Sequence, residues 1–442
     1  MAKLTPDRNL SPQPPAVADR DIVRAAAATV PGADPAARIP NAGVLSARLN
    51  ALISSSGQKT SAVVIDATTR EPLYQQRADR PATPASTTKL VTSVAALAAL
   101  GPAHKITTQA VEGGTAGSVV LVGGGDPTLT TRPATSSSGS RARSGQGDPA
   151  FGSFTDLARQ TANTLKASGV RRVRVDFDIS AYQGPRTAAG WKSNYLPDGE
   201  VAPVSALTVD EGRVEQGAKT RVGDPPRAAA ATFARLLSRY GVKAQAGRQA
   251  AAPAGARRLG AVQSPTLAAL VEYLMTHSDN DVAEAVLRQV AIKRGRPATF
   301  AGGAQAVREV LAGLGVAGGV LTNDGSGLSP RNQITPLALA RIAALAASPQ
   351  RPDLRAAITG MPVAGFSGTL SPPRYTGASS RAGAGMVRAK TGTLSGVSTL
   401  AGVAYDADGR LLAFAFMAGD GTGQVDPGKL DRLAGAVAAC GC

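Results

Sequence analysis

Four short strand patterns lie near the two ends of the chain and form two predicted hairpins. Residues 61–66 and 72–76 flank a turn, as do residues 397–405 and 411–417. Apolar stretches of this length around a short turn are typical of antiparallel pairs. Because helical patterns fill the chain between the two hairpins, we expect an α/β fold in which an antiparallel sheet is flanked by helices and closed by both termini.

The most apolar helical pattern runs from Ser86 to Leu100, with apolar side chains on nearly every face after its first turn. Such a pattern is typical of a buried central helix, and Gly101-Pro102 ends it. Further helices are predicted over residues 44–54, 266–276 and 281–292, and after Asp426-Pro427.

Residues 104–255 have a different pattern of predicted elements, with a strand at 118–122 and helices at 154–167 and 228–240. Residues 173–179 alternate between apolar and polar side chains, which is the period of a half-buried strand. The predicted parts of the chain are an irregular N-terminal tail (1–42), a main domain (43–103 plus 256–442) and an inserted α/β subdomain (104–255) with a flexible Ser/Gly/Arg-rich loop (131–149).

The chain is strongly basic, with 48 Lys and Arg against 31 Asp and Glu, and its formal net charge is +17. Such an excess favours an anionic partner, which could be nucleic acid, lipid headgroups or an anionic cell-wall polymer. The sequence has no basic run interleaved with aromatic residues and no zinc-finger spacing. Nucleic acid is therefore not expected as a partner.

Both cysteines, Cys440 and Cys442, belong to a terminal Cys-Gly-Cys. A disulfide across so short a loop would be strained, so these residues cannot staple the fold, and the sequence does not define their role. No histidine lies near them in the sequence, and we expect neither a metal site nor a cofactor.

Three short motifs occur in a fixed order on predicted elements of different types. They are Ser86-Thr87-Thr88-Lys89 at the start of the apolar helix, Ser278-Asp279-Asn280 at a helix–helix turn and Lys390-Thr391-Gly392-Thr393 before the terminal strands. Each motif alone is common. Together and in this order they match the signature of class A β-lactamases and penicillin-binding proteins.

Over residues 43–437 the chain resembles the D-alanyl-D-alanine carboxypeptidase/endopeptidases of the penicillin-binding protein 4 type. Besides the three motifs, the similar stretches are Pro84–Leu90, Gly123–Leu129, Val201–Leu207 and Asn323–Ser329. The resemblance implies a penicillin-recognising, serine transpeptidase/β-lactamase-like fold that carries the inserted subdomain.

The spacing of the first motif suits nucleophilic catalysis. Serine and lysine three residues apart on a helix share one face. Burial of the helix would favour the neutral form of Lys89, which could then take the proton of Ser86. The backbone N–H groups of Ser86, at the helix N-terminus, and of Thr393 are the candidate oxyanion donors.

The other motif residues receive roles from this chemistry combined with the resemblance. Ser278 can relay a proton between the leaving amine and Lys89, and Asn280 can hold the substrate amide and the Lys89 side chain. The residues expected to bind the terminal carboxylate and the backbone of the substrate are Lys390, Thr391, Gly392 and Thr393.

Residues of the inserted part help to bind the peptide side chain in this family. The corresponding stretch here contains Trp191, Tyr195 and Glu200, and a free amine on the peptide would suit Glu200 or Asp198. The alternative is that Trp191 and Tyr195 pack the junction between the domains.

Two competing patterns are interpreted as structural. Residues 313–318 match a dinucleotide-binding glycine pattern, but they follow a helix and precede a strand, which is the reverse of a phosphate site. His104 and His277 are the only histidines available for a Ser-His-Asp triad. His277, next to Ser278, is interpreted as a residue of the pocket edge or of the fold.

We therefore expect a serine D-alanyl-D-alanine carboxypeptidase/endopeptidase that cleaves peptidoglycan stem peptides through an acyl-enzyme on Ser86 and that β-lactams acylate. One alternative is a β-lactamase, although the deacylating glutamate of class A enzymes is not found after the second motif. The other is a non-catalytic penicillin-sensing or cell-wall-binding protein.

The expected location follows from the three motifs, because they indicate an enzyme that acts on the cell wall. No stretch reaches the roughly 18 apolar residues of a membrane span, and the run at 25–30 is too short for a signal-peptide core. We expect an extracytoplasmic protein, secreted, periplasmic or wall-associated, whose export signal is not present in this chain. Its expected partners are stem peptides, β-lactams, and anionic wall polymers or lipid headgroups.

Overall fold

The computed structural model describes residues 36–54, 59–132, 148–215 and 217–441. The predicted tail (1–42) and the predicted loop (131–149) lie mostly outside these residues. Within the described part of the chain, no helix is long and apolar enough to cross a membrane.

The main sheet has five strands in the order β10-β11-β12-β1-β2, and every neighbouring pair is antiparallel. Its strands are β1 (Thr60–Asp66), β2 (Pro72–Gln76), β10 (Val387–Leu394), β11 (Val397–Tyr405) and β12 (Leu411–Gly419). The first strand pairs with the last, with Ala62 opposite Phe416. The prediction of a sheet closed by both ends of the chain is therefore confirmed.

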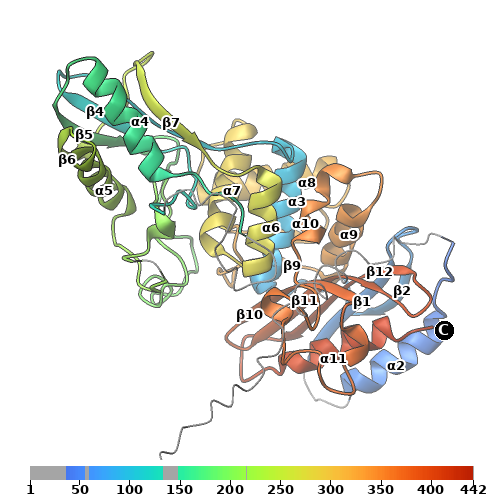
Figure 1. Cartoon of the computed structure of the whole chain (residues 1–442). Coiled ribbons are helices and arrows are strands. Elements are labelled where there is room, and N and C mark those ends of the chain that lie inside the picture. Colours follow the sequence, from blue (N-terminus) through green and yellow to red (C-terminus); the bar gives the residue numbers. More distant parts are fainter. Residues whose placement is uncertain (1–35, 55–58, 133–147, 216, 442) are drawn as a thin grey trace, which may run out of the picture.

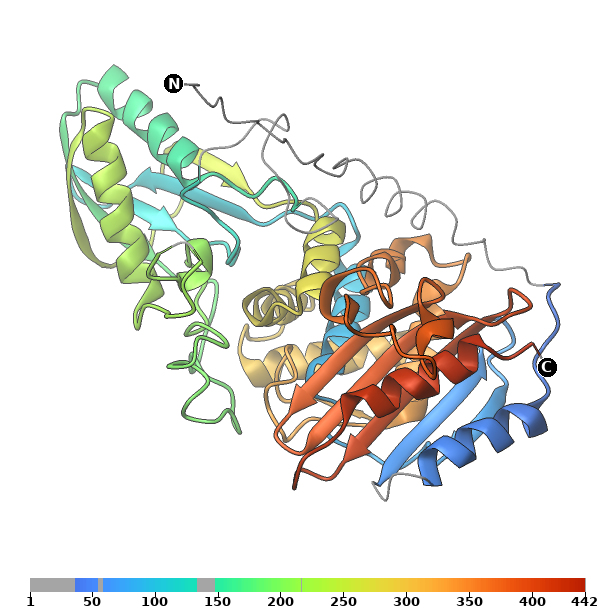
Figure 2. The ribbon, with the colours of Figure 1, turned by 60° about the horizontal axis from the view of Figure 1, so that its bottom comes forward.

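Both faces of the main sheet are buried. On β12, Phe414 and Phe416 pack with helices α2 (Ala42–Ser54) and α11 (Pro427–Ala438), which lie side by side across one face (Figure 2). The alternate residues Ala413, Ala415 and Met417 face the helical region on the other side. Burial on two faces explains why β12 is apolar at consecutive positions instead of alternating.

The helical region is built around α3 (Thr88–Leu100) and lies between the two sheets (Figure 1). Its other helices, all in contact with α3, are α6 (Leu267–His277), α7 (Asn280–Lys293), α8 (Phe300–Gly313), α9 (Pro336–Ala347) and α10 (Ala356–Thr359). The predicted central helix begins two residues late, because Ala85–Thr87 form a 3-10 turn, η1. A small sheet of β8 (Val320–Leu321) and β9 (Gln333–Ile334) completes this region.

The inserted segment forms a second five-stranded sheet in the order β6-β5-β4-β3-β7. Its elements are β3 (Thr107–Glu112), β4 (Ser118–Val122), α4 (Phe154–Ala167), β5 (Arg172–Asp178), α5 (Pro225–Arg239), β6 (Lys243–Gln249) and β7 (Arg258–Gln263). Helices α4 and α5 pack together on this sheet at the upper left of Figure 1. The sheet continues to Gln263, past the predicted boundary at 255, and the division into domains stays a prediction.

Strand β5 differs from its predicted half-buried pattern. Asp176 and Asp178 are 2% and 8% exposed, because β6 and the chain that follows it bind the two carboxylates. Asp176 Oδ1 accepts a hydrogen bond from the N–H of Arg248 at 2.9 Å, and Asp178 Oδ2 accepts one from the N–H of Ala252 at 2.8 Å. Alternation identified the strand, but only the first half of its polar side, Arg172 and Arg174, is exposed to solvent.

Candidate active site

Ser86 lies in η1, directly before the buried helix α3. The side chains of Thr87 and Thr399 both donate to the Pro84 carbonyl oxygen, at 2.6 and 2.7 Å, which anchors the turn to β11. Ala85 and Thr87 are buried, whereas Ser86 is partly exposed. The turn therefore presents the Ser86 hydroxyl at the surface of a firmly packed helix.

The Lys89 side chain is completely buried one turn along from Ser86. Its Nζ atom lies within hydrogen-bond distance of Ser86 Oγ at 2.9 Å, Asn280 Oδ1 at 2.6 Å and the Ser326 carbonyl oxygen at 2.7 Å. Burial lowers the pKa of Lys89 to about 8, against the opposing charge of Asp324 and three other carboxylates. A lysine with this pKa is partly uncharged near neutral pH.

The second motif forms the turn between α6 and α7. Ser278 ends α6 with a left-handed backbone (φ 58°), and Asp279 caps α7 by accepting from the N–H of Val282 at 2.7 Å. The turn brings Asn280 to Lys89 and Ser278 to Lys390, whose Nζ donates to Ser278 Oγ at 2.8 Å. Ser278 and Asn280 thus each contact a lysine of another motif, while Asp279 caps the helix.

The third motif lies on β10, an edge strand of the main sheet. Lys390 is fully buried, and burial together with the charge of Lys89 holds its pKa well below the usual range. A Cβ atom on Gly392 would lie 2.7 Å from the Pro84 oxygen and 2.9 Å from the Ser86 nitrogen. Glycine is therefore required for β10 to approach the Ser86 turn this closely.

Two backbone N–H groups are available beside the Ser86 hydroxyl. On β10, the N–H of Ala389 donates to Pro362 and the oxygen of Thr391 accepts from Lys390, so these odd-numbered residues point away from β11. The N–H of Thr393 continues this alternation and faces the same side. Within the described residues the N–H of Ser86 has no acceptor. This is the donor pair expected for an oxyanion.

The residues predicted from the inserted segment lie beside the site in different ways. Trp191 donates from Nε1 to Asp324 at 2.8 Å and packs edge-on against Phe300, whereas Tyr195 is buried against a small apolar cluster. The Glu200 side chain is exposed, and its backbone oxygen accepts from Asn280 Nδ2 at 2.8 Å. Trp191 and Tyr195 both have packing contacts, and their role in binding the peptide side chain stays a prediction.

Sequence reasoning gave no role to a buried loop that supports Lys89. Asp324 accepts hydrogen bonds from the N–H groups of Gly327 and Ser329, and Glu284 accepts from that of Ser326, whose oxygen then meets Lys89. Burial raises the pKa of Glu284 to about 7. The similarity noted for Asn323–Ser329 was the available signal, but the function of the stretch depends on contacts that only the fold creates.

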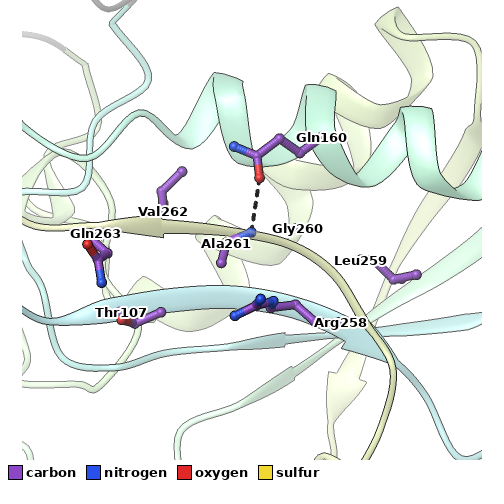
Figure 3. Close-up of a pocket in the computed structure, with 8 residues that line it drawn as sticks. All are labelled: Thr107, Gln160, Arg258, Leu259, Gly260, Ala261, Val262 and Gln263. Atoms are coloured by element: carbon purple, nitrogen blue, oxygen red, sulfur yellow. Dashed lines mark hydrogen bonds between the residues drawn. The ribbon is translucent and has the colours of Figure 1, made fainter.

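Other candidate features lie apart from Ser86. His277 is exposed, with Nε2 3.4 Å from Asp148 Oδ1, and among the described residues neither histidine is hydrogen-bonded to Ser86. A cavity of about 560 Å³ follows the edge strand β7, where Gln160 Oε1 accepts from the N–H of Ala261 at 3.2 Å (Figure 3). No motif residue lines it, so it belongs to the inserted segment. Cys440 is buried and is not a free thiol.

Known proteins with similar sequences cover nearly the whole chain. The model of the D-Ala-D-Ala carboxypeptidase 3 (S13) family matches residues 45–226 and 215–437. Carboxypeptidase Rv3627c of Mycobacterium tuberculosis is 37% identical over 439 residues, 98% of this chain and 89% of the relative. The D-alanyl-D-alanine carboxypeptidase of Actinomadura sp. is 30% identical over 444 residues, 86% of this chain and 81% of the relative.

The fold also matches a solved structure. Penicillin binding protein 4 from Haemophilus influenzae has a TM-score of 0.69 at 21% identity, covering 87% of this chain and 97% of that one. The same protein has been solved in complex with a β-lactam. The predicted fold class and the resemblance to the penicillin-binding protein 4 type are confirmed. The chain belongs to the D-Ala-D-Ala carboxypeptidase 3 (S13) family and is a serine-type D-Ala-D-Ala carboxypeptidase.

Proposed function

We propose that Ser86 forms an acyl-enzyme with peptidoglycan stem peptides that end in D-Ala-D-Ala, and that β-lactams acylate the same hydroxyl. The observation that carries this proposal is the 2.9 Å distance from Ser86 Oγ to the Nζ atom of a fully buried lysine, Lys89. Burial of this amine makes its uncharged form available, and only that form can accept the hydroxyl proton.

The reaction has two steps. Ser86 Oγ bonds to the carbonyl carbon of the penultimate D-Ala while Lys89 Nζ takes the hydroxyl proton, and the N–H groups of Ser86 and Thr393 stabilise the oxyanion. The C–N bond then breaks, and Ser278 Oγ, which Lys390 contacts, relays the proton from Lys89 Nζ to the leaving amine, so that Lys89 is neutral again and D-Ala is released. Water hydrolyses the ester in the second step and restores the free serine.

The substrate is held from two sides in this proposal. Its terminal carboxylate meets the hydroxyls of Thr391 and Thr393 near the Lys390 amine. Thr391 is already oriented by Thr369, with their Oγ1 atoms 2.7 Å apart. The exposed Glu200 carboxylate suits a free amine on the peptide side chain. A wall peptide as substrate places the enzyme outside the cytoplasmic membrane.

The proposal is tested by peptide mapping after labelling with a reporter penicillin. The label is expected on the peptide that contains Ser86, and a pentapeptide ending in D-Ala-D-Ala is expected to release D-Ala. Labelling of another residue would contradict the proposal, and labelling without D-Ala release would favour a penicillin-sensing protein. A penicilloyl adduct that lasts minutes to hours agrees with a peptidase, whereas its rapid turnover would indicate a β-lactamase.

Part of the net charge of +17 comes from five basic residues that lie together at one end of the inserted segment. Lys166 lies in the last turn of α4 and Arg239 ends α5. Arg171 directly precedes β5, and Arg172 and Lys243 begin β5 and β6. Arg172 is paired with Lys243 in the sheet, and Arg171 Nη1 donates to the Lys166 oxygen at 3.0 Å. Among the described residues these five cations have no carboxylate partner. We propose that they bind an anionic wall polymer.

Reversing three of these charges is expected to weaken polymer binding without affecting the chemistry. The variant with Arg171→Glu, Arg172→Glu and Lys243→Glu should lose most of its salt-sensitive co-sedimentation with a polyglycerol-phosphate matrix, because phosphate contacts dominate such binding. Release of D-Ala from a soluble peptide should stay unchanged. The control reverses three exposed arginines elsewhere, Arg70, Arg80 and Arg381. Equal losses in both variants, or binding only to anionic lipid vesicles, would contradict the proposal.

A further inference from the structure

A buried arginine joins three segments of the chain around Asn280. The Arg221 side chain is only 4% exposed, and its Nη2 atom lies 3.0 Å from Asp281 Oδ2. Its Nη1 donates to the backbone oxygen of Glu211 at 2.6 Å, and its Nε donates to the backbone oxygen of Gly199 at 3.3 Å. The guanidinium group therefore connects α7 with two separate parts of the segment that precedes α5.

Two of these contacts adjoin the groups that hold the Asn280 carboxamide. Asp281 directly follows Asn280 in α7, and Gly199 directly precedes Glu200, whose oxygen accepts from Asn280 Nδ2 at 2.8 Å. On its other side, Asn280 Oδ1 accepts from Lys89 Nζ at 2.6 Å. Arg221 thus fixes the distance between the helix that carries Asn280 and the carbonyl that orients it.

Arg221 lies among buried carboxylates, so its removal would be energetically unfavourable. Glu211, Asp279 and Asp281 bring carboxylate oxygens within 4.8 Å of one another, and burial raises the pKa of Asp281 to about 6 even though Arg221 opposes the rise. Arg213 neutralises Glu211 at 2.8 Å, but among the described residues the only cation that ion-pairs with Asp281 is Arg221. Removal of Arg221 would leave a buried carboxylate uncompensated beside Asn280.

We propose that Arg221 is a positioning residue of the peptidase: it holds the Asn280 carboxamide, and through it the Lys89 amine, at the Ser86 hydroxyl. Arg221 has no hydrogen bond or ion pair with Ser86, Lys89 or Asn280 and acts through the segments that flank Asn280. This inference rests on the proposed roles of Lys89 and Asn280 in acylation.

Two neighbouring arginines provide a matched comparison. Arg213 binds the same glutamate as Arg221 but neither Gly199 nor Asp281. Arg221→Met is expected to lower the rate constant of acylation by a reporter penicillin about 10- to 100-fold, the effect of misplacing one charge-assisted hydrogen bond. The dissociation constant of the initial complex should change much less. Arg213→Met should change the rate less than about threefold, as for a partly exposed pair, and Arg221→Lys should recover part of the loss.

The decisive measurement combines Arg221→Met with Asn280→Ala. If Arg221 acts through Asn280, the double variant acylates no more slowly than Asn280→Ala alone, because the two changes remove one interaction. Rate losses that multiply, or equal losses in Arg213→Met and Arg221→Met, would overturn the inference. Thermal unfolding checks that each variant is folded, and Asp281→Asn replaces Arg221→Met in the same cycle if that variant is not.

The same series separates failure of the inference from failure of the proposed function. If Ser86→Ala is still acylated, or Asn280→Ala acylates at the normal rate, the proposed chemistry is wrong and the inference falls with it. If both variants are impaired and the cycle is additive, the proposed chemistry stands and only the positioning role of Arg221 is wrong.

Discussion

Replacing Ser86 by alanine is expected to abolish penicillin labelling and to lower the release of D-Ala by about 10⁶-fold, as when the nucleophile of another serine hydrolase is removed. The loss is this large because no second hydroxyl occupies the same position. Ser278 Oγ is bound by Lys390, and the Thr87 hydroxyl is bound to the Pro84 carbonyl. The measurements are covalent labelling by gel fluorescence and D-Ala release from a pentapeptide.

The control for this prediction is Ser93→Ala in the same helix. Ser93 is completely buried, and among the described residues its Oγ atom has no hydrogen-bond partner. Removing an unpaired buried hydroxyl costs little stability, so the variant should label and hydrolyse as the unmodified enzyme does. Penicillin labelling that persists in Ser86→Ala would show that another residue is the nucleophile.

Replacing Lys89 by methionine is expected to lower the acylation rate by about 10²- to 10⁴-fold, the range of general-base catalysis. In the unmodified enzyme burial lowers the pKa of Lys89 to about 8. Only the neutral amine accepts a proton, so the rate should rise with pH up to about 8 and level off above it, with about a tenth of the maximal rate at pH 7. The Lys89→Met variant should lose this pH dependence, which stopped-flow acylation between pH 5 and pH 10 would measure.

Lys429→Met provides the matched control, because Lys429 is another buried lysine, 1% exposed, on helix α11. Its Nζ atom donates to Thr60 Oγ1 at 2.8 Å, across the main sheet from α3. This variant should lose stability but keep the pH profile of acylation. An unchanged pH profile in Lys89→Met would show that a different group is the base.

Much of the fold was predictable because the helical and the strand spacing of apolar residues can each be seen within a short segment of the sequence. The hairpins at the two ends, the central helix and helices α4, α6 and α7 follow from apolar spacing and from capping residues such as Asp426, whose Oδ1 accepts from the N–H of Gly428 at 2.8 Å. The less regular elements were missed. Strand β6 has mostly exposed or partly exposed side chains and carries no apolar pattern, so its place in the second sheet depends on pairing with β5.

The candidate site also has residues that the sequence identified and residues that it did not. The three motifs could be found because a serine and a lysine on one helix turn, a capped Ser-Asp-Asn turn and a Lys-Thr-Gly strand are each encoded within a few residues. Lys89 meets the carbonyl of Ser326, Trp191 meets the carboxylate of Asp324, and Asp281 meets the guanidinium of Arg221, each across a long chain separation. Their spacing along the sequence therefore contains no signal of their contacts.

The sequence by itself determined the family, the type of each main element and the three short motifs, because these depend on residue chemistry over a few positions. The tertiary structure alone decided the pKa values of the two lysines and the geometry of the Ser86 turn. Burial of Lys89 and Lys390 lowers their pKa values, and the approach of Gly392 to Ser86 sets the geometry of the turn. Desolvation and close backbone contact are properties of a packed fold, and no segment possesses them before the chain has folded.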